Sequence, residues 1–339
     1  MISNLFRISA VFFAATAFIL LYPHSGFAAK TRTFEVDYTV EVPSLPGGAR
    51  EVRVWIPYPS SNEDQRILSI NVESPAPYEV NYDTEWGNGM VYFRLVPVGG
   101  FTFTMRFVVE RRERVVDPTG NPGDRPEGKM DVRLFKRFLM PSAYAVHNER
   151  VERLSRMAVK GKTGYAEKAR DIYDFTLENM EYSKKVPGWG KGDVDRICLA
   201  IGEGKQGTGN CTDFHSFFGS LMRFQSIPVL FEMGFPLTPG KDSVEPIKGG
   251  YHCWAKFYVP GIGWVPVDIS EADKDPSKKD YFFGAVCENR FSLSRGRDIL
   301  LVPPQRGARL NFFGPDPYIE VDGESFTGFT RTISYRDVK

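Results

Sequence analysis

The segment GTGNCTDFHSFFGSLMR, residues 207–223, predicts a buried helix that begins at a cysteine. Its apolar residues recur with the i, i+3, i+4, i+7, i+8 spacing of one helical face: Phe214, Phe217, Phe218, Leu221 and Met222. Asn210 is a favourable N-cap, and Asp213 places an acidic side chain in the first turn. Cys211 therefore occupies the first helical position, where backbone N–H groups and the helix dipole lower the pKa of a thiol.

A second segment, GGYHCWAKFYVPGIGWVPVDISEAD (249–273), predicts a β-hairpin with strands over 251–259 and 264–270. Two apolar rows should share the core side of the sheet: Cys253, Ala255, Phe257 and Val259 in the first strand, and Val265, Val267 and Ile269 in the second. The opposite side then carries His252, Trp254 and Asp268. This alignment requires a connecting loop of three or five residues, because an even loop would separate His252 from Asp268.

A thiol at a helix start, with a histidine and a carboxylate on neighbouring strands, is the arrangement that nucleophilic catalysis requires. We predict that Cys211 attacks a carbonyl carbon and that His252 takes and returns protons. Asp268 would orient the imidazole and stabilise its cationic form. The backbone N–H of Cys211 would supply part of an oxyanion hole.

Other roles for Cys211 are a small buried hydrophobe or a zinc ligand together with His215, His252 and Cys253. The zinc site is disfavoured because Cys253 belongs to the opposite strand face from His252, and adjacent residues of one strand rarely bind one ion. We therefore expect no metal and no cofactor, with His215 packed behind the site. A disulfide among Cys198, Cys253 and Cys287 remains open.

The chain has 339 residues and a formal net charge of +1, which gives no reason to expect a nucleic-acid partner. Residues 1–28 combine Arg7, an apolar run over 8–22 and the small residues Gly26 and Ala28, a pattern typical of a secretory signal peptide. We therefore expect an exported protein, periplasmic or secreted, with no stable membrane span after signal cleavage. An uncleaved N-terminal anchor is the alternative.

The order of patterns predicts two folded parts after the signal peptide. Alternating β-branched and aromatic runs indicate an N-terminal β-domain over 30–116. A linker and a short helix follow over 117–147, and a catalytic domain over 148–339. Helical periodicity is clearest over 149–159 and 165–180, whereas 182–209 is expected to be irregular.

Several blocks of the sequence together resemble the transglutaminase-like superfamily, particularly its bacterial exported members. They are NMEYSKK (179–185), GWGKGDV (188–194), GNCTDFHSFF (209–218), SIPVLFEMGFP (226–236), GGYHCWAKFYVPGIGWVPVDIS (249–270) and DYFFGAV (280–286). The resemblance covers about residues 150–320. It implies an α+β fold with a papain-like core, in which the cysteine-bearing helix packs on an antiparallel sheet, preceded by a small β-sandwich-like domain.

The same resemblance implies a triad of Cys211, His252 and Asp268 that acts on amide bonds through a thioester. The expected partner is a protein or peptide substrate, including cell-wall peptides. Hydrolysis is the leading interpretation; transfer of the acyl group to an amine and a non-catalytic binding or assembly role are the alternatives. Some relatives stabilise the oxyanion with an upstream tryptophan, but the position of Trp189, the only tryptophan shortly upstream of Cys211, does not match that role. Gln206, five residues before Cys211, resembles the oxyanion glutamine of papain-like proteases, with a solvated loop side chain as the alternative.

Overall fold

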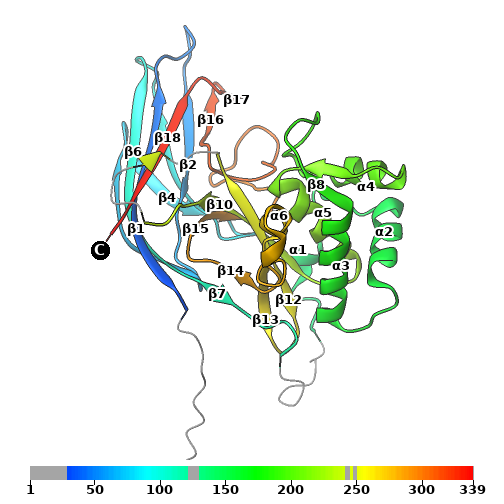
Figure 1. The fold of residues 1–339 in the computed structure, drawn as a ribbon. Coiled ribbons are helices and arrows are strands. Elements are labelled where there is room, and N and C mark those ends of the chain that lie inside the picture. Colours follow the sequence, from blue (N-terminus) through cyan, green and yellow to red (C-terminus); the bar gives the residue numbers. More distant parts are fainter. Residues whose placement is uncertain (1–28, 121–129, 241–244, 247–249, 339) are drawn as a thin grey trace, which may run out of the picture.

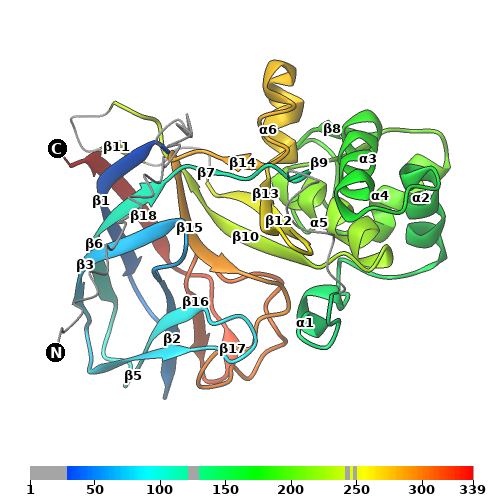
Figure 2. The same cartoon turned by 90° about the horizontal axis from the view of Figure 1, so that it is seen from below.

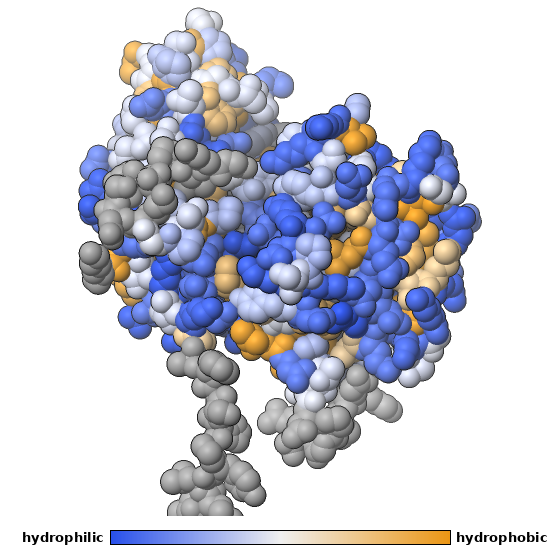
Figure 3. All heavy atoms as spheres, viewed as in Figure 1, coloured by the Kyte–Doolittle hydropathy of each residue, from blue (hydrophilic) through white to orange (hydrophobic). Residues whose placement is uncertain are grey.

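The computed structural model describes residues 29–120, 130–240, 245–246 and 250–338. The predicted signal peptide lies outside the described residues, and so does the part of the predicted linker at 121–129. Among the residues described, no helix is long and apolar enough to cross a bilayer. On the face drawn in Figure 3, hydrophobic side chains lie in separate patches among hydrophilic ones.

A β-sandwich forms one side of the molecule (Figure 1). One sheet has the order β11-β18-β1-β6-β3, and its strands are Glu245–Pro246, Thr330–Asp337, Thr31–Val42, Phe101–Arg112 and Gln65–Glu73. The other has the order β17-β16-β2-β5-β4, and its strands are Glu324–Ser325, Tyr318–Val321, Val52–Tyr58, Gly89–Leu95 and Tyr78–Tyr82. In β1 every second side chain from Phe34 to Val42 is buried, as expected for a strand with one face on the core.

The sandwich is built from both ends of the chain, since β16, β17 and β18 come from its last residues. β18 pairs with β1, and β16 pairs with β2. The structure therefore differs from the predicted division, which assigned all of 148–339 to the catalytic domain. The reason is long-range strand pairing, which leaves no local mark in the sequence.

The other side of the molecule is a helical layer on a four-stranded antiparallel sheet of order β13-β12-β10-β15 (Figure 2). The strands are Gly263–Val267, His252–Val259, Val229–Pro236 and Arg290–Arg295. The main helices are α2 (Glu149–Val159), α3 (Tyr165–Asn179), α4 (Val194–Gly202) and α5 (Cys211–Phe224). Shorter elements are α1 (Lys136–Leu139), α6 (Ile269–Lys274), the 3₁₀ turn Pro276–Lys278, β7 (Arg114–Val115), β8 (Met180–Tyr182), β9 (Gly207–Gly209) and β14 (Ala285–Val286).

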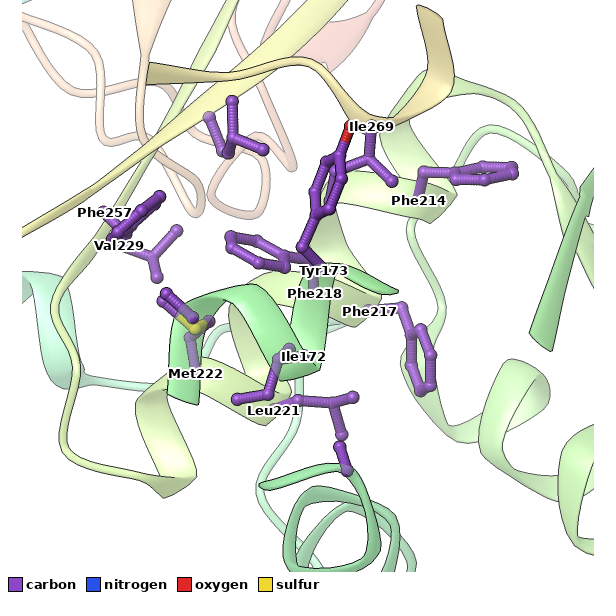
Figure 4. Close-up of a cluster of buried hydrophobic side chains, with 14 of the residues drawn as sticks. Ile172, Tyr173, Phe214, Phe217, Phe218, Leu221, Met222, Val229, Phe257 and Ile269 are labelled. Atoms are coloured by element: carbon purple, nitrogen blue, oxygen red, sulfur yellow. The ribbon is translucent and has the colours of Figure 1, made fainter. Parts of the chain in front are cut away.

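Helix α5 is the centre of this layer. It contacts α2, α3, α4 and α6 as well as β10 and β12, and its residues 211–223 are all buried. Figure 4 shows its apolar side chains packed among Ile172 and Tyr173 of α3, Val229 of β10, Phe257 of β12 and Ile269 of α6. The predicted cysteine-bearing helix on an antiparallel sheet, beside a sandwich, is confirmed.

The predicted hairpin is confirmed in its register and wrong at its end. Ala255 pairs with Val267 and Phe257 with Val265, so the connection between the strands is the three-residue loop 260–262. The second strand ends at Val267 instead of continuing to Ser270, because Asp268 caps α6 by accepting a hydrogen bond from Glu271 N at 3.3 Å. The predicted irregular stretch 182–209 contains α4 and the short strand β9.

The core under α5 generates a prediction about stability. Phe218 is fully buried and meets Phe257 edge to face, with ring centroids 6.2 Å apart. We expect Phe218→Ala to lower the free energy of unfolding by about 3–5 kcal/mol, measured by guanidinium unfolding. Leu199→Ala, on the exposed side of α4, is the control and should change it by less than about 0.5 kcal/mol. Equal losses in the two variants would contradict this assignment of the core.

Candidate active site

The start of α5 is fixed by reciprocal capping. Asn210 Oδ1 accepts a hydrogen bond from Thr212 N at 2.9 Å, and Asp213 Oδ2 accepts one from Asn210 N at 2.9 Å. Asp213 also accepts from Gly190 N at 2.6 Å and Gly192 N at 3.0 Å, which ties the glycine-rich loop to the helix. The sequence identified Asp213 only as an acidic residue of the first helical turn. In the structure its buried carboxylate holds the loop at Gly190 and Gly192 against the start of α5.

A glycine is required beside this carboxylate. A Cβ atom on Gly209 would lie 2.3 Å from Asp213 Cβ and Oδ2, closer than non-bonded atoms approach. The glycine of the GNC motif thus allows the chain to pass Asp213 and enter α5, which holds Cys211 at the first helical position.

Cys211 is a buried thiol, 2% exposed, at the N-terminus of α5. Burial alone would raise its pKa, but hydrogen bonds with Cys253 and His252, and the positive charge of His252, hold it well below its ordinary value. The first N–H groups of a helix have no intrahelical acceptor, so they add a positive potential at the same place. The environment therefore favours a thiolate.

His252, the first residue of β12, bonds to Asp268 through Nε2, which lies 2.8 Å from Oδ2 of the carboxylate. The other ring nitrogen, Nδ1, is then the atom available to the Cys211 thiol, whose pKa the neighbouring His252 lowers. Burial lowers the pKa of His252, yet the charge of Asp268 and both hydrogen bonds raise it to about 9. The imidazole is therefore cationic at neutral pH.

Asp268 is fully buried and stays ionised because cationic groups surround it. Burial opposes ionisation, but His252 and the guanidinium of Arg290, whose Nη2 lies 3.1 Å from Oδ2, keep the carboxyl pKa below its usual range. Sequence reasoning did not identify Arg290. This residue begins β15, the edge strand that lies beyond β10 in the same sheet.

His215 lies behind the site, as predicted. Its Nε2 accepts a hydrogen bond from Ile269 N at 3.1 Å, so Nδ1 carries the proton and donates to Cys211 O at 2.7 Å. Burial lowers the pKa of His215, so the ring is neutral. It connects the first turn of α5 to the start of α6.

The position of Cys253 differs from the expectation that the apolar face of its strand lies away from the site. This residue belongs to the apolar face of β12, yet it lies in one buried cluster with Cys211, Phe231 and Met233. All four cysteines are free thiols. Within the described part of the chain, no group of three or more His, Cys, Asp or Glu side chains could hold a metal ion.

The candidate oxyanion side chain, Gln206, and the rejected Trp189 are both exposed. Gln206 is exposed and donates to Glu178 O at 3.3 Å, and β9 separates it from the helix start by about 10 Å. Trp189 is 39% exposed and lies under the ammonium group of Lys184, 5.7 Å from its ring centroid.

Comparison with known proteins adds an independent line of argument. A model of the transglutaminase-like superfamily matches residues 152–269, a range that contains Cys211, His252 and Asp268. An uncharacterised protein of Haemophilus influenzae is 27% identical over 344 residues, covering 91% of this chain and 90% of its own length.

Among solved structures, a candidate cysteine protease from Cytophaga hutchinsonii has a TM-score of 0.58 at 18% identity, with 92% of this chain and 91% of that chain covered. This likeness establishes a shared fold over both parts of the molecule. The periplasmic domain of TgpA from Pseudomonas aeruginosa is also similar, with a TM-score of 0.34, 14% identity, and 74% of this chain and 91% of that chain covered.

The family model, the cysteine-bearing helix and the antiparallel sheet agree with the resemblance seen in the sequence. Residues 152–269 are therefore similar to the core domain of the transglutaminase-like superfamily.

Proposed function

We propose that this protein is an exported thiol hydrolase that cleaves amide bonds with Cys211, His252 and Asp268. The observation that carries the proposal is the buried chain of contacts from the Cys211 thiol through His252 to Asp268, with the 2.8 Å bond between the last two. The charge of Asp268 and the interactions within the pair outweigh burial, so that the thiol is deprotonated and the imidazole protonated before substrate arrives.

In the first step the Cys211 thiolate adds to the amide carbonyl, forming a C–S bond and an oxyanion. The backbone N–H of Cys211, at the start of α5, donates to the developing charge. The proton on His252 Nδ1 passes to the leaving nitrogen, the C–N bond breaks, and the amine departs. A thioester remains on Cys211, and His252 is neutral.

In the second step water attacks the thioester. His252 Nδ1 takes a proton from the water as the C–O bond forms, and the C–S bond then breaks. The acid product leaves, and Cys211 and His252 return to the thiolate and imidazolium. Asp268 keeps its charge throughout and holds the ring through Nε2.

The proposed substrates are peptides or proteins outside the cytoplasm, cell-wall peptides included. The proposal of export rests on the pattern of residues 1–28. Water is favoured as acceptor because it is always present, whereas transfer to an amine requires a cleft that excludes it.

Isotope labelling tests this function and separates hydrolysis from transfer. A peptide library containing backbone amides and glutamine side chains is incubated in ¹⁸O-water with dansylcadaverine and read by mass spectrometry. We expect ¹⁸O in newly formed carboxyl groups. Dansylcadaverine in the peptides would instead support transamidation. Products that persist unchanged with Cys211→Ser would contradict the proposal.

The thiolate at Cys211 can be read without substrate. With iodoacetamide, wild-type Cys211 should react much faster at neutral pH than Cys198, a buried thiol whose pKa burial raises to about 12. His252→Ala should move the half-maximal pH of Cys211 alkylation upwards, because the imidazolium that stabilises the thiolate is gone. Identical pH profiles of Cys211 alkylation in the wild type and in His252→Ala would exclude an ion pair between Cys211 and His252.

Asp268→Asn tests the carboxylate. Without its charge the pKa of His252 should fall from about 9 towards or below 6.5, so the imidazolium is lost at neutral pH. The alkylation profile of Cys211 should therefore shift upwards, and amide turnover should fall by about 10²–10⁴-fold.

Asp275→Asn makes the same chemical change at the exposed end of α6 and is the matched control. It should leave both the alkylation profile and the turnover unchanged. A shift of equal size in the two variants would remove the assigned role from Asp268.

A further inference from the structure

The hydroxyl of Tyr251 lies beside the nucleophile, and the proposed mechanism does not use it. Asn210 and Thr212 are the residues on either side of Cys211 in the chain. Asn210 Nδ2 donates a hydrogen bond to Tyr251 Oη at 2.9 Å, and Thr212 Oγ1 donates one at 3.1 Å. The Tyr251 ring packs against the buried cluster that contains Cys211. The phenol oxygen is thus held at the start of α5, next to the residue that attacks the substrate.

These two bonds leave the Tyr251 hydroxyl with a proton to donate. A hydroxyl oxygen accepts two hydrogen bonds and donates one. Asn210 Oδ1 accepts from Thr212 N, so the amide atom that faces Tyr251 is Nδ2, a donor. No group in the part of the chain that the structure describes accepts the remaining phenol proton. An unused donor beside a nucleophile is what an oxyanion hole requires.

The contacts of Thr212 agree with this direction. Thr212 Oγ1 lies 3.4 Å from Cys253 Sγ, a distance at which either atom could donate. The single hydroxyl proton of Thr212 is used in the bond to Tyr251, so the Cys253 thiol donates to Thr212. Both partners of the phenol oxygen are therefore donors, and its own proton is directed to neither.

We propose that Tyr251 is a catalytic residue whose O–H stabilises the oxyanion formed when Cys211 attacks the substrate carbonyl. The thiolate sulfur forms the C–S bond, and the π electrons of the carbonyl move onto its oxygen. That oxygen accepts one hydrogen bond from the backbone N–H of Cys211 and a second from Tyr251, with no proton transferred. When the C=O bond forms again and the C–N bond breaks, the negative charge leaves the oxygen.

The surroundings of the phenol suit this role. Burial raises the pKa of Tyr251, so the hydroxyl keeps its proton at neutral pH. Gly190, with a φ of +80°, brings no side chain against the oxygen; a Cβ atom there would lie 3.3 Å from Tyr251 Oη. Gly190 N donates to Asp213, the carboxylate that also caps α5. The ring of Phe312, with its centroid 5.8 Å from that of Tyr251, supports the aromatic ring.

Tyr251 takes the place that the sequence offered to Gln206. The Gln206 side chain is exposed, and its amide donates to Glu178 O at 3.3 Å. Tyr251 lies immediately before β12, whose first residue is His252. The strand that positions the base therefore also positions the proposed oxyanion donor.

The test compares two reactions of the same thiol. p-Nitrophenyl acetate acylates Cys211 through an oxyanion, whereas iodoacetamide alkylates it by displacement at a saturated carbon, with no oxyanion. The ratio of the two rates therefore cancels any change in the amount of thiolate. We expect Tyr251→Phe to lower the ratio of acylation to alkylation by about 10²-fold and to leave the alkylation rate unchanged. Release of p-nitrophenol gives the first rate, and mass spectrometry of the Cys211 peptide gives the second.

Two controls accompany this variant. Tyr258→Phe removes a phenol near the other end of β12 and should leave the ratio as in the wild type. Cys211→Ser gives the background of p-nitrophenol released by other groups. Circular dichroism confirms that each variant is folded.

Three results would overturn the assignment: an unchanged ratio in Tyr251→Phe, an equal fall of both rates in that variant, or the same fall of the ratio in Tyr258→Phe. An equal fall of both rates would mean that Tyr251 only holds the thiol in place. The inference rests on the proposed function, but its test needs no amide substrate. A wild-type protein whose Cys211 is alkylated like an ordinary thiol would contradict the proposed function itself, which is a different outcome.

Discussion

The buried charge of Asp268 is the constraint on which the candidate site depends. An isolated carboxylate costs several kcal/mol to remove from water, so it must be surrounded by donors and positive charge. Here those groups come from separate elements: His252 from β12, Arg290 from β15, and the backbone of α6 through Glu271 N. The sheet, the helix and the ion pair are therefore fixed together.

The charge of Asp268 affects the protonation of His252 and, through it, that of Cys211. Asp268 keeps His252 protonated, and the imidazolium in turn favours a thiolate at Cys211. By linkage, the raised pKa of His252 stabilises the fold below about pH 6.5, and that contribution is lost as pH rises through about 9. The depressed pKa of Asp268 acts with opposite sign, since its contribution is present above its unfolded value near 4 and is lost on acidification. The two contributions are therefore fully present together between about pH 4 and 6.5.

The sandwich and the sheet that carries His252 are joined by a shared hydrophobic core and by buried ion pairs. Phe235 of β10 and Phe291 of β15 enter the hydrophobic core of the sandwich. Lys256 of β12 meets Asp64 at 2.5 Å and Glu63 at 3.0 Å, both from the segment that leads into β3. The sandwich therefore supports the strands that hold the candidate site, and the return of β16 and β18 to it closes the fold from both chain ends.

Much of this arrangement could be predicted because its signals are local. The apolar spacing of α5 and the parity of the hairpin were sufficient to bring Cys211, His252 and Asp268 into one region. The DISE sequence at 268–271 also carries a helix-start signal, which the apolar pattern of the preceding strand obscured. Arg290 and strands β16 to β18 could not be predicted, because they reach their partners only in the folded chain. Strand alternation also failed to predict that Cys253 shares a buried cluster with Cys211. Alternation assigns a side chain to one face of a sheet, but it does not show which other elements that side chain meets.

The ion pair proposed between His252 and Cys211 in the resting protein can be tested directly. Nitrogen-15 NMR of the histidine side chains reports the protonation of each ring nitrogen directly. We predict that His252 has protons on both nitrogens at neutral pH and loses one only near pH 9. In Cys211→Ser the same ring should lose this proton at a lower pH, because the interaction with Cys211 raises the pKa of His252. A His252 ring that is neutral at pH 7, with the titration of an ordinary exposed histidine, would contradict the account.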